Sequence, residues 1–246
     1  MLKVLFLLFG CLWMLSPCAA QELEVGGKAG ALFAPTGFVE ITVPISNRVA
    51  VNTFGFYVGS LQAGIAILEV PLSVHKHFTL TPGYLFLSVP PSGISLFTNQ
   101  PASQSFTENQ FRLAGTISST FHRLILSDRN MYVREFTSTG GVNSYRNRVY
   151  LARKFIVGSY AFTPFVFDEV HHDFVIGNLV SSNLAVAGAN FPINGHLTFE
   201  PSFIRQDEQH LRGGNFLGLA LIITTGKLFH APKKPAAGDA TSHASP

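Results

Sequence analysis

Apolar and polar residues alternate along most of the chain after Phe38, and this alternation is typical of β-strands. β-Branched and aromatic residues come in runs that are separated by clusters of Gly, Pro, Asn and Ser. No convincing amphipathic helix interrupts these runs. The clearest predicted strands cover 60–72, 76–89, 108–120, 128–137, 144–156, 160–172, 182–192, 196–206 and 214–226, and the stretch 22–58 holds two or three more.

The alternation gives the predicted strands one apolar and one polar face. In the strand at 144–156, Val149 and Leu151 fall on one face, whereas Arg146 and Arg148 fall on the other. This pattern suits a barrel wall with lipid outside and a polar lumen inside. A soluble sandwich of two β-sheets has the same period of two, so periodicity alone leaves that alternative open.

The connections between the predicted strands alternate between tight and long. Val157-Gly158 and Asn194-Gly195 are tight, whereas 90–107, 173–181 and 206–213 are longer and polar. Outer-membrane barrels have short periplasmic turns and longer outer loops. We therefore predict an all-β fold, an antiparallel up-and-down transmembrane β-barrel of about 10–12 strands. If both ends of the barrel are periplasmic the number is even, and we favour twelve.

The N-terminal residues 1–20 have the order of a secretory signal peptide. Lys3 precedes an apolar run, and small residues follow up to Ala20, so we predict cleavage after Ala20. A lipid anchor on Cys18 is the alternative, and both interpretations export the chain. We assign 21–229 to the barrel and 230–246 to a disordered C-terminal tail, whose composition is too poor in apolar residues to fold.

Composition supports an exported membrane barrel and argues against a nucleic-acid partner. Only 13% of the residues are charged, against about 25% in typical soluble domains. Both cysteines precede Ala20, so the predicted mature chain has no disulfide or thiolate. Once the basic and acidic residues of the two end segments are set aside, 14 basic and 13 acidic residues remain. We expect an outer-membrane location, with outer-membrane lipid and the barrel assembly machinery as partners and no cofactor.

The stretch from about Glu108 to Gly226 resembles a bacterial family known as domain of unknown function 2490. The resemblance is carried by Ser127-Asp128-Arg129-Asn130, Tyr145-Arg146-Asn147-Arg148, the run from Pro164 to Glu169, and Asn194-Gly195 leading into Phe199-Glu200. Phe167 stands where the family pattern has tyrosine, and the N-terminal third matches poorly. The resemblance implies an outer-membrane barrel and no reaction, ligand or catalytic residue.

Turn positions predict an ionic network in the lumen. If Ile156 faces Ser159 across a turn at Val157-Gly158, Arg146 lies opposite Glu169. If a loop centred on Gly140-Gly141 pairs Phe136 with Tyr145, Glu135 also lies opposite Arg146. We therefore predict that Glu135, Arg146 and Glu169 form a lock across three strands, with Arg148 one layer deeper.

Candidate chemistry is sparse elsewhere in the chain. His171, His172 and Glu169 have residue types that bind metal, but adjacent histidines on a strand point to opposite faces, so polarity at the barrel rim is the favoured interpretation. His196 lies near Thr198, Glu200 and Ser202, yet the His and Ser spacing of a lipid deacylase is absent. We therefore do not expect an enzyme.

The leading interpretation of function is an outer-membrane barrel with a small-solute pore or binding cavity. One alternative is a lipid-modifying barrel enzyme, and another is a soluble periplasmic sandwich that binds a ligand. Arginines in the middle of the chain suggest a basic strip that favours anions in a pore. We prefer the view that they pair with acids and lock a small barrel. These arginines are Arg112, Arg123, Arg129, Arg134, Arg146, Arg148 and Arg153, and the acids are Asp128, Glu135, Asp168 and Glu169.

Overall fold

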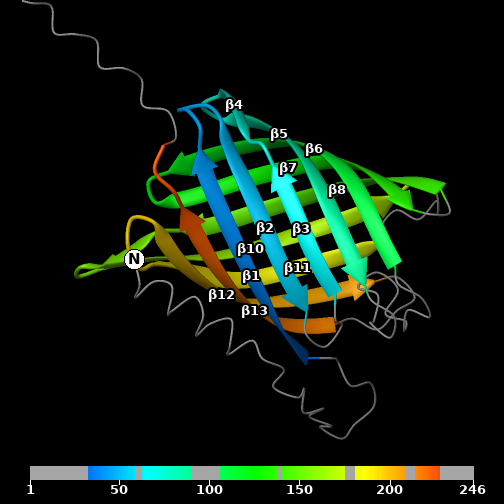
Figure 1. The fold of residues 1–246 in the computed structure, drawn as a ribbon. Coiled ribbons are helices and arrows are strands. Elements are labelled where there is room, and N and C mark those ends of the chain that lie inside the picture. The colour runs from blue at the N-terminus through cyan, green and yellow to red at the C-terminus, as the bar shows by residue number, and fades with distance from the viewer. Residues whose placement is uncertain are drawn as a thin grey trace, which may run out of the picture.

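The structure is a computed structural model that describes residues 33–58, 63–89, 106–137, 140–174, 181–208 and 214–227. The predicted signal segment, the predicted tail and the chain before Phe33 lie outside these residues. Within them no helix is long and apolar enough to cross a membrane. The described chain forms one β-sheet (Figure 1).

Thirteen strands make up the sheet. Eleven of them correspond to predicted runs, although those that begin at Leu124 and Gly140 start four residues earlier than predicted, and the short strands at 72–75 and 155–157 are not predicted separately. The thirteen strands are β1 (Phe33–Pro44), β2 (Ala50–Val58), β3 (Ala63–Glu69), β4 (Leu72–His75), β5 (Phe78–Val89), β6 (Phe106–Phe121), β7 (Leu124–Thr137), β8 (Gly140–Arg153), β9 (Phe155–Val157), β10 (Tyr160–Asp173), β11 (Ser182–Pro192), β12 (Leu197–Glu208) and β13 (Gly214–Thr224).

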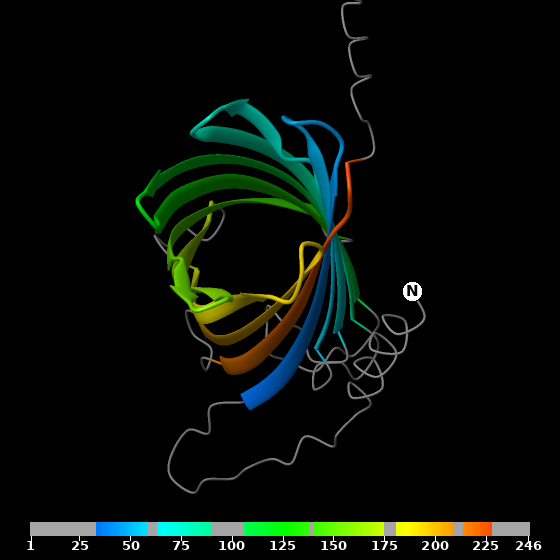
Figure 2. The ribbon, with the colours of Figure 1, turned by 90° about the vertical axis from the view of Figure 1, so that its left-hand side faces the viewer.

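The sheet closes on itself through the pairing of β10 with β11, and it therefore forms a barrel (Figure 2). The short strands β4 and β9 extend the wall beside β5 and β10, and the other eleven strands form the ring. A single closed sheet excludes the two-sheet sandwich as the architecture of the described residues. All pairings in the ring are antiparallel except that of β1 with β13.

The closed ring differs from the predicted even and fully antiparallel barrel. Consecutive strands of the ring reverse direction, so an odd number leaves the first and the last strand pointing the same way. The described ring has eleven strands, and β1 and β13 consequently pair in parallel, with Phe38 beside Ala220. The expectation of twelve strands with both ends on one rim is not met within the described chain.

The two rims of the barrel carry different connections. We call the turn rim the end at which β1 joins β2, β4 joins β5, β6 joins β7, β9 joins β10 and β11 joins β12. We call the other end the loop rim; the chain between β5 and β6 and between β10 and β11 is longest there. At the turn rim Gly158 has a φ of 62°, a conformation that glycine adopts without strain and that makes the two-residue turn from Val157 to Tyr160 possible.

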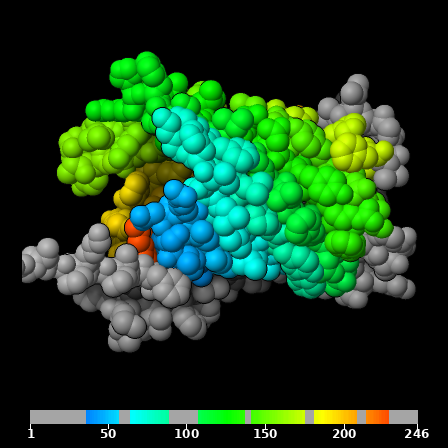
Figure 3. Space-filling model, turned by 90° about the horizontal axis from the view of Figure 1, so that it is seen from above, coloured from blue at the N-terminus to red at the C-terminus, as the bar shows by residue number. Residues whose placement is uncertain are grey.

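The alternation along each strand separates an apolar outer wall from a mixed lumen. Large apolar residues are exposed on the outer wall on all sides of the ring, among them Val39, Leu68, Phe86, Phe111, Leu126, Tyr132, Val149, Val166, Phe203 and Leu219. The buried apolar core faces the lumen instead, and it includes Leu87, Ala114, Val133 and Phe165. Viewed from above, the wall of β2 to β6 is continuous, and the turn rim is hollowed between the β4–β5 hairpin and the β9–β10 hairpin (Figure 3).

Candidate functional site

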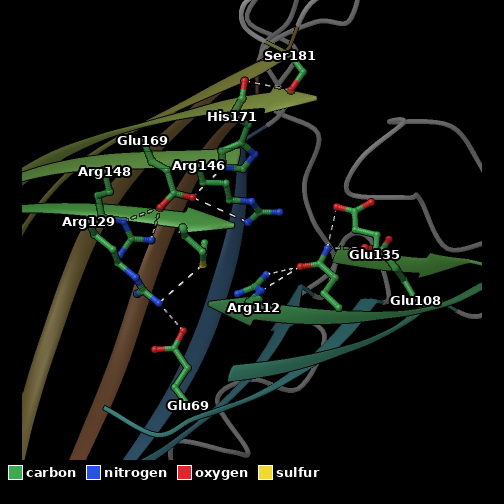
Figure 4. Close-up of polar contacts among 12 residues, drawn as sticks. Glu69, Glu108, Arg112, Arg129, Glu135, Arg146, Arg148, Glu169, His171 and Ser181 are labelled. Atoms are coloured by element: carbon green, nitrogen blue, oxygen red, sulfur yellow. Dashed lines mark hydrogen bonds and ion pairs between the residues drawn. The ribbon is translucent and has the colours of Figure 1, made fainter. Parts of the chain in front are cut away.

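Charged and amide side chains from five strands meet inside the barrel, towards the loop rim (Figure 4). We call this set the lumen network. Its members are Glu69 on β3, Glu108, Gln110 and Arg112 on β6, Arg129 and Glu135 on β7, Arg146 and Arg148 on β8, and Glu169 and His171 on β10. Four arginines therefore face four glutamates in a confined space, where ionic contacts are stronger than in water.

Glu169 is the most heavily bonded acid of the network. It lies directly opposite Arg148, whose Nε and Nη2 atoms each approach its Oε2 atom at 2.6 Å. The ring of His171 contacts the other carboxylate oxygen at 2.8 Å. The Glu169 side chain is only 4% exposed, so these bonds replace the water that the carboxylate has lost. Arg148 also stacks over the ring of Phe167, with its guanidinium carbon 4.5 Å from the ring centre.

Gln110 connects an arginine to two acids on the opposite side of the network. Its Oε1 atom accepts hydrogen bonds from Nε and Nη2 of Arg112, at 3.0 and 2.7 Å. Its Nε2 atom donates to Glu108 and, at 3.2 Å, to Glu135. Gln110 is fully buried, so its orientation is fixed by these partners.

Arg129 and Glu69 form an ion pair between strands that are not neighbours. The Nη2 atom of Arg129 lies 2.7 Å from Oε1 of Glu69, although β5 and β6 separate their strands in the ring. The pair therefore reaches across the curved inner wall and draws β3 towards β7. The network therefore joins strands that are not neighbours in the ring.

Arg146 differs from the other three arginines because it donates no hydrogen bond within the described residues. Its nearest acid oxygen is Oε1 of Glu169 at 3.9 Å, and its Nε atom is buried without a partner. Its side chain is 12% exposed and lies between the Glu169 group and the Glu108 and Glu135 group (Figure 4). The Oγ atom of Ser144, two residues earlier on the same face, is also buried without a partner.

The network consequently has an excess of donors. Each of the four glutamates accepts at least one hydrogen bond from the network, whereas Arg146 donates none to a described acceptor and has only the 3.9 Å ion pair with Glu169. A buried arginine in this state favours an acceptor oxygen from a molecule that enters the lumen. The arrangement is therefore chemically able to hold a small oxyanion or another oxygen-rich solute.

The structure brings together most of the predicted lock, but in a different register. Arg146 lies opposite Met131 rather than Glu135, and opposite His171 rather than Glu169. Both shifts are by an even number of residues, so the predicted side chains still face the lumen. Arg148 takes the predicted place of Arg146 beside Glu169, and Glu135 bonds to Gln110 instead.

The reason for the larger shift lies in Gly140 and Gly141, which belong to strand β8 and not to a loop. Gly141 lies opposite Phe136, and the guanidinium of Arg134 covers it so closely that a Cβ atom would stand 2.6 Å from Nη2 of Arg134. The glycine therefore makes room for an arginine side chain on the outer wall, a role that the sequence pattern does not distinguish from a turn.

The weak metal candidates are not brought together. His171 contacts Glu169 in the lumen, whereas His172 follows it on the strand and so faces the outer wall. Among the described residues no group of three or more His, Cys, Asp or Glu side chains could hold a metal ion.

The predicted basic strip is divided between the two faces of the wall. Arg112, Arg129, Arg146 and Arg148 line the lumen. Arg134 and Arg153 instead lie on the outer wall, over the rings of Phe136 and Phe155. Glu69, Glu108 and Gln110 were not predicted as site residues. The alternation of Glu108, Gln110 and Arg112 with Phe111 and Leu113 is the signal that would have identified two of them.

Comparison with known proteins supports a family and no activity. No curated protein matches the chain. A solved structure of outer-membrane expressed OmpT of Vibrio cholerae is similar at 8% sequence identity with a TM-score of 0.37, covering 66% of this chain and 51% of that chain. The chain thus spans about half the length of that structure. The model of the family described as Protein of unknown function (DUF2490) matches residues 41–216, which is more than half of the chain. The chain therefore belongs to the DUF2490 family.

Proposed function

We propose that the protein is an integral outer-membrane β-barrel whose lumen binds and admits small solutes carrying a carboxylate or phosphate group. The proposed location is supported by the closed ring, in which each of the eleven strands pairs on both sides, and by the apolar outer wall. Leu126 and Leu219, far apart around the ring, are 51% and 42% exposed, as expected for side chains that contact lipid.

The observation that carries the proposed solute class is the free donor capacity of Arg146. A guanidinium binds carboxylate or phosphate through two parallel N–H bonds, and its charge persists at every physiological pH. Ser144, two residues earlier on the same strand, supplies an unpartnered hydroxyl as a second polar group. The acids of the network do not compete fully for Arg146, because each of them already accepts a bond from another donor.

The lumen favours small solutes over large ones. Side chains fill much of the wall around the network, since Leu87, Gln110 and Val133 are completely buried. An eleven-strand ring is intermediate between small barrels with filled interiors and the much wider porins. Passage past Arg146 is therefore expected to be narrow and selective.

Conductance of the purified, refolded protein in planar lipid bilayers tests this function. We expect small discrete current steps in potassium chloride, and a reduction of the current when inorganic phosphate or acetate is added. Arg146→Met should abolish the reduction by phosphate while leaving the steps in place. Arg153→Met is the matched control, because Arg153 belongs to the same strand but lies on the outer wall.

Two results would contradict the proposal. Silent bilayers together with turnover of the surrounding lipid would favour the barrel enzyme. Equal block by phosphate in wild type and Arg146→Met would place the anion site elsewhere. The location is tested separately: the protein should fractionate with outer membranes, and an unheated sample should run faster on a gel than a heated one, because a closed sheet resists detergent in the cold.

A further inference from the structure

The turn rim carries charge of one sign. Its described connections hold five lysine and arginine residues and no aspartate or glutamate. None of the five has an ion pair within the described chain, whereas near the loop rim Arg205 pairs with Asp207 at 2.8 Å. All five cations are exposed, and they are Arg48, Lys76, Arg123, Lys154 and Lys227.

The five cations lie on successive turns along one arc of the rim. At one end, the Nζ atom of Lys227 donates to the side chain of Asn47, the residue before Arg48, at 2.5 Å. At the other end, the peptide N–H of Lys154 donates to the carbonyl oxygen of Arg123 at 2.9 Å. Backbone hydrogen bonds also join the β4–β5 hairpin, which carries the remaining cation, to the strands on its two sides. Neighbouring strands are about 5 Å apart, so the charges of adjacent turns lie within roughly 10 Å and reinforce one another.

The most exposed large apolar side chains of the described wall lie at the same rim. Their exposed fractions are between 60% and 79%, and no large apolar side chain elsewhere in the described chain reaches this range. Two of them precede a rim cation by two residues, which are Lys76 and Arg123. The turn rim therefore places apolar side chains directly beside positive charges. The five apolar residues are Val74, Phe121, Val157, Tyr160 and Ile193.

This combination suits a phospholipid surface. Ammonium and guanidinium groups attract the phosphates of headgroups, while adjacent apolar and aromatic side chains enter the boundary between headgroups and acyl chains. A water-soluble polyanion would satisfy the cations but would leave Phe121 and Tyr160 in water. The same rim of a second copy would set cation against cation.

From these observations we infer that the turn rim binds the headgroups of anionic phospholipids and gathers them around the barrel. The inference rests on the proposed membrane location but not on the passage of a solute through the lumen. Short turns of outer-membrane barrels face the periplasm, so the phospholipids are those of the periplasmic leaflet. A zwitterionic headgroup brings an ammonium group together with its phosphate, and the rim consequently prefers headgroups with a net negative charge.

Fluorescence quenching by brominated lipids tests this inference. The only tryptophan of the chain is Trp13 in the predicted signal segment, so the predicted mature chain accepts a single reporter at a chosen place. Phe121→Trp reports at the turn rim. Phe86→Trp is the matched control, because Phe86 is exposed towards the loop rim and its neighbours on the adjacent strands are Ala66 and Asn109.

Each reporter variant is refolded into phosphatidylcholine vesicles that contain brominated phosphatidylglycerol or brominated phosphatidylcholine. The dependence of quenching on lipid content gives the relative affinity for the two lipids. At the Phe121→Trp reporter we expect phosphatidylglycerol to be preferred about threefold or more. At the Phe86→Trp reporter the two lipids should quench alike.

Charge variants link the preference to the rim cations. Arg123→Gln with Lys154→Gln should lower the preference at the Phe121→Trp reporter to about the control value. Arg123→Lys keeps the charge and should retain the preference. Arg205→Gln is the matched control variant, since Arg205 is exposed near the opposite rim. High salt should weaken the preference because it screens exposed charges.

The outcomes separate this inference from the proposed location. Each variant is first checked for faster gel migration without heating, and Arg123→Gln alone replaces the double variant if the latter does not fold. An absence of quenching by either lipid at both reporters would reject the membrane location, and the inference with it. Quenching without preference at the rim reporter would support the location, overturn the inference and leave the rim to an acidic protein. An equal preference at both reporters, or one that survives removal of the two charges, would also overturn it.

Discussion

Arg148 and Glu169 face each other across β8 and β10, and two nitrogens of the arginine contact one carboxylate oxygen at 2.6 Å. The carboxylate is buried, whereas the arginine side chain is 32% exposed. Solvent therefore screens the arginine of this pair but not the carboxylate. Removal of Arg148 is expected to affect stability mainly because Glu169 stays buried with fewer donors.

Arg148→Met is expected to lower the free energy of unfolding by about 2 kcal/mol, because it leaves Glu169 with fewer donors in a buried position. Arg148→Met combined with Glu169→Gln should recover part of this loss, because residue 169 then carries no buried charge; the recovery is partial because Arg146 loses its ion pair with Glu169. Urea unfolding in lipid vesicles measures both variants, with the gel migration of unheated samples as the readout of the folded fraction. Equal loss in the single and double variants would show that the two side chains do not act as a pair.

Arg146→Met should destabilise the barrel less than Arg148→Met, by roughly 0–1 kcal/mol, although both arginines belong to one strand. The physical reason is that Arg146 donates no hydrogen bond within the described chain, so its removal breaks none there. The same unfolding assay compares the two variants. A greater loss for Arg146→Met would mean that Arg146 holds the acids of the network together.

Gly188→Ala is expected to cost about 1–3 kcal/mol, because the added methyl overpacks the lumen. A Cβ atom at Gly188 would stand 2.7 Å from the ring of Phe165 and 2.8 Å from the backbone oxygen of Pro201, which cannot move aside easily. Gly55→Ala is the matched control, since nothing lies within 4 Å of a Cβ atom there. That variant should be neutral or slightly stabilising in the same assay.

Leu219→Arg should reduce the amount of folded protein in membranes, with a cost of about 2–4 kcal/mol if the middle of β13 contacts the bilayer interior. Leu124→Arg, at the turn-rim end of β7, should cost only about 0–1 kcal/mol because the interface is wet there. The fraction that migrates in the unheated, folded form measures the difference. Equal behaviour of the two variants would argue against a membrane-spanning wall.

The sequence predicts the faces of the strands better than their register. Period-two alternation and the observed strands put Arg146, Arg148 and Glu169 on one face, because an even shift in register preserves the face of every residue. Which residues lie opposite each other depends on where the turn between two strands ends. Gly140-Gly141 is compatible both with a turn and with a strand position where a neighbouring side chain leaves no room for a Cβ atom. The pairing of Glu69 with Arg129 joins residues far apart in the chain, which local periodicity cannot reveal.

Closure of the ring was also beyond the local pattern. A local pattern predicts each strand from its own residues, whereas the parallel pairing of Phe38 with Ala220 depends on how many strands separate them. An even number of strands follows only if both ends of the barrel lie on one rim, and no residue of the chain encodes that condition.

The parallel pairing of β1 and β13 puts the two ends of the described ring on opposite rims, whereas an even ring has both ends on one rim. The chain enters β1 at the loop rim and leaves β13 at the turn rim, so the first and last described strands open towards opposite ends of the cylinder. In a membrane, an epitope inserted just before β1 and one placed just after β13 would be exposed to two different compartments. A single molecule would thus carry a reporter for each side of the bilayer it crosses.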